Sequence, residues 1–152
     1  MRKFIAALVL GLGFCVGTLP AYGAPSTYDA KAMLEQQSFK LLELSRSFDA
    51  GSKEFAFASL GASKLLQAQG LYAHLMDLQA LAESVGEPGA RDILKNRWES
   101  LQMSIYLSCE IFPRDLLQYA QAAANAKVAA ELTASKKVVE AACTAGRGAL
   151  PE

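Results

Sequence analysis

The chain has few of the residues that carry most enzyme chemistry, with one histidine, three cysteines and one tryptophan among 152 residues. A Ser-His-Asp or Cys-His arrangement would have to use His74, the only imidazole. The sequence contains no Cys-x-x-Cys-His motif for haem attachment and no Glu-x-x-His pairs for a di-iron site. We therefore predict no catalytic residue, no metal site and no cofactor, and we expect the protein not to be an enzyme.

Charge of either sign is also sparse and unclustered. The 15 basic and 15 acidic residues balance, and the basic ones are scattered along the chain. Nucleic-acid binding proteins usually gather Lys and Arg on one face, so we expect no nucleic-acid partner. Glu83, Glu87 and Asp92 lie near one another without the spacing of a calcium loop, and acidic residues at a helix start are favoured by the helix dipole. We predict a structural role for them.

Residues 1–23 have the features of a secretory signal peptide. Arg2 and Lys3 precede an apolar run over residues 4–16, and Ala21 and Gly23 are small residues at the two positions that a signal peptidase reads. The run is shorter than the roughly 20 residues that span a bilayer, which argues against an uncleaved membrane anchor. We expect cleavage after Gly23 and a periplasmic or secreted protein.

Cys15 raises the alternative of a lipoprotein, but Phe14 stands where an acylation site has a small residue. No later segment is apolar enough to span a membrane, so we expect no span after cleavage. Residues 24–152 are long enough for one core, and we expect one domain with flexible ends.

Apolar residues recur at intervals of three and four over most of the chain, and no stretch alternates long enough to predict a strand. The spacing predicts an all-α fold, an antiparallel bundle of about four main helices near residues 30–48, 53–85, 90–123 and 127–145. Thr27 or Asp29 is the expected cap of the first helix, and Ser52 that of the second.

Three polar or small residues interrupt these patterns. Gly61 suggests a break in the second helix, and Gly70 a place where a neighbouring helix comes close. Gln37 lies on the apolar stripe of the first helix, either at its boundary with water or in a buried polar contact. We favour the boundary position.

Pro113 predicts a kink in the third helix, because proline lacks the amide proton and clashes with the preceding turn. In an oxidising compartment Cys109 and Cys143 are expected to form a disulfide, which needs Cα atoms within about 7 Å. A straight helix between them would hold them about 50 Å apart, so the chain must reverse near Ala126, beside Asn125. The alternative, a straight helix over residues 113–145, would exclude this bond.

Aromatic and apolar residues of the middle helices are the candidate binding residues, namely Tyr72, Trp98, Leu101 and Tyr106. Trp98 and Leu101 lie on the inward stripe, and Tyr106 lies beside it, where it could border a partner surface.

Without a catalytic set, binding is the expected function. We expect an exported, non-enzymatic helical protein that binds a periplasmic protein partner, such as an inhibitor, an immunity factor or an accessory subunit. The alternative is a small-ligand carrier or sensor with an apolar pocket between helices, lined by Tyr72, Trp98 and Leu101. The alanine-rich stretch 120–130 allows close helix approach within one chain or in a homodimer.

Overall fold

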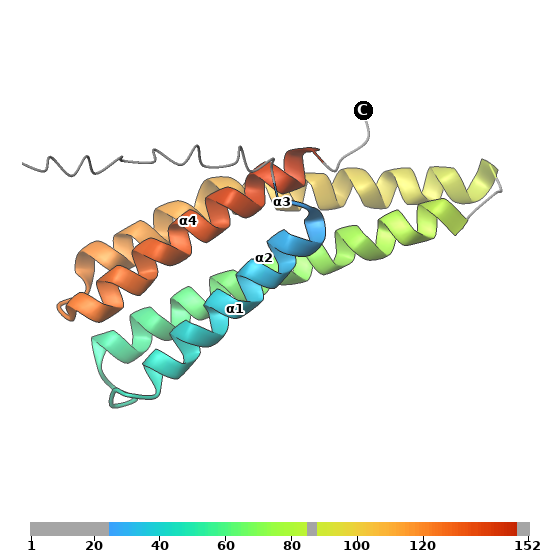
Figure 1. The fold of residues 1–152 in the computed structure, drawn as a ribbon. Helices are drawn as coiled ribbons and strands as arrows, with labels where there is room; N and C mark the ends of the chain where they lie inside the picture. The colour runs from blue at the N-terminus through green and yellow to red at the C-terminus, as the bar shows by residue number, and fades with distance from the viewer. Residues whose placement is uncertain (1–24, 85–87, 149–152) are drawn as a thin grey trace, which may run out of the picture.

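The computed structural model describes residues 25–84 and 88–148, which form an all-α, antiparallel bundle (Figure 1). Its four helices are α1 (Thr27–Ser45), α2 (Lys53–Ser84), α3 (Pro88–Ala122) and α4 (Ala126–Gly148). Helix α1 packs on α2 and α4, and α3 packs on the same two helices, so α1 and α3 lie diagonally opposite. The fold class predicted from apolar periodicity is confirmed. The predicted signal peptide, residues 1–23, lies outside the described residues, as do the last four residues of the chain.

Helices α2 and α3 are longer than α1 and α4. They contain 32 and 35 residues, whereas α1 and α4 contain 19 and 23. Figure 1 shows the C-terminal part of α2 and the N-terminal part of α3 continuing together beyond the ends of α1 and α4. At 1.5 Å per residue, the 13 extra residues of α2 over α1 extend it by about 20 Å. The C-terminal part of α2 and the N-terminal part of α3 therefore form a two-helix arm that projects from the bundle.

The helix starts are capped by side chains. Ser26 precedes α1 and accepts a hydrogen bond on Oγ from the Asp29 amide at 3.1 Å, and the Asp29 carboxylate accepts from the Ser26 amide at 3.1 Å. This reciprocal pair is a capping box. The prediction of Thr27 or Asp29 as the cap was therefore wrong, because the N-cap of α1 is Ser26. The Phe55 amide donates to Ser52 Oγ at 3.1 Å, which confirms Ser52 as the cap of α2.

The chain reverses between α3 and α4 at the position predicted from the two cysteines. Asn125 Oδ1 accepts hydrogen bonds from the amides of Lys127 at 2.9 Å and Val128 at 3.2 Å. No described non-glycine residue has a positive φ, so Asn125 acts through its side chain and not through a left-handed backbone.

Cys109 and Cys143 form a disulfide with Cα atoms 5.7 Å apart. This confirms the predicted pairing and excludes a straight helix over residues 113–145. The Tyr72 hydroxyl donates to the carbonyl of Ala142, which joins α2 to α4 next to the same bond.

The predictions for both glycines of α2 were wrong: the helix does not break at Gly61, and no neighbouring helix comes close at Gly70. The helix is continuous through Gly61, which is buried; a Cβ there would lie 2.5 Å from Leu132 Cδ2 and 3.0 Å from Leu41 Cδ1. Gly70 is exposed, and a Cβ there would meet nothing within 4 Å. Close helix approach therefore occurs at Gly61.

Helix α3 also continues through Pro113, which is buried, so the predicted kink is not confirmed. Proline cannot donate the bond that the carbonyl four residues earlier would accept. That carbonyl belongs to Cys109, whose side chain is fixed to α4 by the disulfide.

The core is built mainly from the predicted inward stripes. Its largest fully buried apolar side chains are Leu34, Leu41, Leu65, Leu75, Leu116, Val128, Leu132 and Val139. No helix within the described ranges is long and apolar enough to cross a membrane.

Candidate functional site

The structure does not bring the four predicted binding residues into one pocket. Tyr72 is buried in the core, where its hydroxyl donates to the Ala142 carbonyl. The cavity beside Tyr72 and the disulfide has a volume of only about 10 Å³. Leu101 is buried, Trp98 is half-buried, and Tyr106 is exposed on the outer side of α3. A space of about 10 Å³ holds at most one water molecule. Tyr72 therefore has a structural role in the fold.

Leu101 lines a groove on the surface of the arm. The groove has a volume of about 210 Å³, and its apolar floor includes Leu71 and Leu78. His74 and Arg97 also line it, and no carboxylate of the described residues does. His74 is exposed.

Trp98 lies one turn before Leu101. Its indole Nε1 is shielded from solvent and has no hydrogen-bond partner in the described part of the chain.

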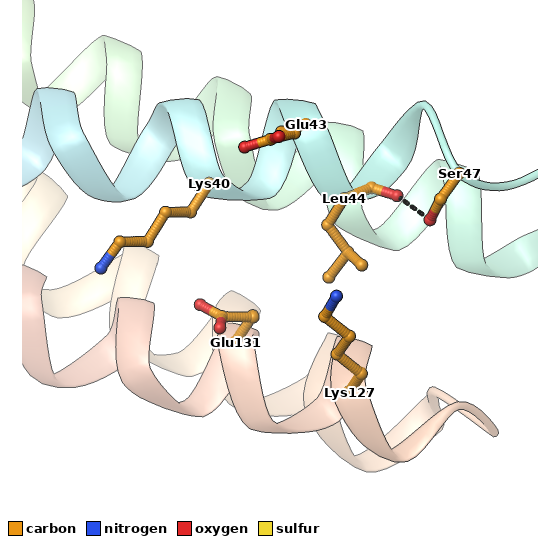
Figure 2. Close-up of a pocket in the computed structure, with 6 residues that line it drawn as sticks. All are labelled: Lys40, Glu43, Leu44, Ser47, Lys127 and Glu131. Atoms are coloured by element: carbon orange, nitrogen blue, oxygen red, sulfur yellow. Dashed lines mark hydrogen bonds between the residues drawn. The ribbon is translucent and has the colours of Figure 1, made fainter.

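A larger cleft separates α1 from α4 (Figure 2). It has a volume of about 440 Å³ and is lined by Lys40, Glu43, Leu44, Ser47, Lys127 and Glu131. Figure 2 shows that Lys40 and Lys127 extend into it from opposite helices, with Glu131 between them. Neither lysine forms an ion pair with a carboxylate of the described residues. Two ammonium groups and two carboxylates give this cleft no net charge.

A buried polar network stands behind the same cleft. Gln37 is only 5% exposed, and its Nε2 donates to Glu131 Oε2 at 3.0 Å and Ser135 Oγ at 3.2 Å. Ser135 Oγ in turn donates to the Glu131 carbonyl at 2.7 Å. The preferred boundary position for Gln37 was therefore wrong, and the alternative of a buried contact is correct. The network holds α1 to α4 and orients Glu131.

The outer face of α3 carries the largest group of exposed apolar side chains on one helix. Met103 is 59% exposed, Tyr106 is 55% and Leu107 is 47%, and Ile111 lies one turn further along. Met103, Leu107 and Ile111 are spaced four apart and Tyr106 lies three residues after Met103, so all four lie on one side of the helix. Of these residues, only Tyr106 is predicted as a binding residue from the sequence. The others could have been found because they are out of phase with the inward stripe.

This face has the composition of a binding surface. Monomers usually expose apolar side chains singly, and contiguous ones mark sites of interaction. Exposed Glu110 and Arg114 lie among the apolar residues.

No group of three or more His, Cys, Asp or Glu side chains that could hold a metal ion occurs among the described residues. Comparison with known proteins found no matching family model, no matching curated protein and no matching solved structure.

Proposed function

We propose that this chain is an exported, non-enzymatic helical protein whose function is to bind a protein partner. Residues 24–152 would form its single domain after removal of residues 1–23. The observation that carries the proposal is the exposed apolar face of α3 around Met103, Tyr106 and Leu107. Burying apolar surface is worth about 25 cal/mol per Å², which favours a partner with its own apolar face.

Export is supported by two independent features. The basic and apolar pattern of residues 1–23 is typical of a signal peptide. The bond between Cys109 and Cys143 is of the kind that persists in an oxidising compartment such as the bacterial periplasm or the cell exterior. Such a setting fits an inhibitor, an immunity factor or an accessory subunit, and the partner is either another exported protein or a second copy of the chain.

The alternative is a small-ligand carrier, and the interior offers it little support. The space beside Tyr72 is about 10 Å³, whereas ligand pockets usually occupy about 300–1,000 Å³. The groove lined by Leu101 is the better candidate for a ligand, at about 210 Å³. Trp98 is the only tryptophan and lies one turn before Leu101, so its fluorescence is the available signal for a ligand in the groove. A saturable change on adding a small apolar anion would favour the carrier.

Photo-crosslinking in the exporting cell tests the partner proposal. A photoreactive amino acid replaces Leu107 in one variant and Leu60 in a control. The two leucines are 47% and 46% exposed, and Leu60 lies on α2 and not on α3. We expect one dominant cross-linked protein from position 107 and none from position 60. Equal labelling at both positions, or none at 107, would contradict the proposal.

A further inference from the structure

We infer that the outer face of α3 binds a second copy of this chain, with the two α3 helices packed antiparallel. This inference rests on the proposed function, because it names the partner of the same surface. Five of the exposed residues lie along the middle of this surface, in the order Met103, Leu107, Glu110, Arg114 and Leu117. Their spacings are four, three, four and three, which is the repeat of a helix that packs along another helix. No helix of the described chain covers this repeat, since α3 contacts only α2 and α4 on its other faces.

The repeat is complementary to itself in one orientation. In a symmetric dimer, residue i of one copy meets residue j of the other, and residue j meets residue i. With a two-fold axis beside Phe112, Glu110 faces Arg114 of the second copy, and Leu107 faces Leu117 of the second copy. Each of these pairs occurs twice. A parallel arrangement would place Glu110 against Glu110 and Arg114 against Arg114, which like-charge repulsion disfavours.

A hydrogen bond within α3 positions the Arg114 side chain for this contact. Its Nε donates to the Glu110 carbonyl at 3.0 Å, which holds the guanidinium along the exposed side of the helix. Guanidinium has five N–H donors and can therefore keep this bond while it contacts a carboxylate on the second copy. Tyr106 lies at one edge of the repeat and Ile111 at the other, where both would add apolar contact.

The size of the contact sets the expected strength. From Met103 to Leu117 the repeat is about 21 Å long at 1.5 Å per residue, and each copy contributes one helix. Such a contact falls in the class below about 1,200 Å², which is typical of weak and transient association. We expect reversible dimerisation with a dissociation constant between about 1 μM and 1 mM.

Sedimentation velocity over a concentration series tests the inference, using the disulfide-bonded protein purified after expression of the full chain. Wild type should change from monomer to dimer with concentration. Leu107→Glu should weaken dimerisation at least about tenfold, because it places a charge in the apolar contact. Leu60→Glu, at matched exposure on α2, should leave the dissociation constant unchanged.

Charge reversal tests the register and also covers the case in which Leu107→Glu fails to fold. Glu110→Arg and Arg114→Glu should each weaken the dimer, and the double variant should restore it, because the pair then meets with exchanged signs. Circular dichroism confirms that each variant is helical. A partner of different sequence would not recover its affinity for the double variant.

Wild type that stays monomeric to about 1 mM would overturn the inference. If position 107 then still cross-links one other protein, the proposed function stands without the dimer; if it cross-links nothing, both fail. A dimer that tolerates Leu107→Glu, or one that the double reversal does not restore, would overturn the α3 interface.

Discussion

Breaking the disulfide between Cys109 and Cys143 should lower the free energy of unfolding by about 4 kcal/mol. The bond joins residues 34 positions apart. In the chain-entropy description, a cross-link removes entropy from the unfolded chain according to the logarithm of the loop length, which gives about 13 cal/mol/K for this loop. At 25 °C that entropy corresponds to about 4 kcal/mol.

The folded state should change little, because other contacts hold the same helices together. Tyr72 still bonds to Ala142, and α3 still packs along α4. Domains of this size have about 5–15 kcal/mol of stability, so the reduced protein should fold with a much smaller margin. The melting temperature should fall by about 10–20 °C.

Urea unfolding followed by far-ultraviolet circular dichroism measures the effect in oxidised and reduced wild type. This comparison keeps both sulfur atoms in place and isolates the cross-link. The double variant Cys109→Ala, Cys143→Ala should resemble the reduced protein, and reductant should leave it unchanged. A difference below about 1 kcal/mol between the two forms of the wild type would refute the loop-entropy reasoning.

Three further predictions concern the helices. Gly61→Ala should destabilise the protein by about 1–2 kcal/mol in urea unfolding, because overpacking outweighs the gain in helix propensity, whereas Gly70→Ala should stabilise it by about 0.5–1 kcal/mol. Gln37→Ala should cost about 1–3 kcal/mol by removing buried hydrogen bonds, and an unchanged urea midpoint would show that the network contributes nothing. Hydrogen bonds from Ser26 lower the pKa of Asp29 below its ordinary 3.8, so its stabilising contribution is complete above that pH and is lost as the pH falls through the lowered value. The difference in midpoint between wild type and Asp29→Asn should therefore close in acid, and a difference independent of pH would contradict this.

The spacing of apolar residues along the chain was sufficient to predict the helices and the faces that they bury. Leu34 and Leu41 are fully buried as the stripe of the first helix predicts, and Ser52 caps the second helix. These features depend on neighbours within one or two turns, which the sequence specifies directly. The disulfide could also be predicted, because Cys109 and Cys143 are the two cysteines that lie outside the predicted signal peptide.

Gly61, Gly70 and Gln37 could not be placed in the same way. Each lies within a periodic helix, and periodicity does not say how closely the next helix approaches. Gly61 is a contact point because Leu132 of α4 points at it, and Gln37 is buried because Glu131 and Ser135 of α4 provide its hydrogen bonds. Both facts depend on residues more than 70 positions away.

The candidate site likewise has features that the sequence predicts and features that depend on the packing of the helices. Sequence alone determined that the chain forms amphipathic helices, that Cys109 and Cys143 can be joined, and that Tyr106 lies beside the inward stripe. Only the tertiary structure decided that Tyr72 lies in the core and that no other described helix covers the side of α3 carrying Met103 and Leu107. The physical reason is that a helix has a fixed angular spacing of side chains, whereas the neighbours that cover each side are determined by the packing of all four helices together.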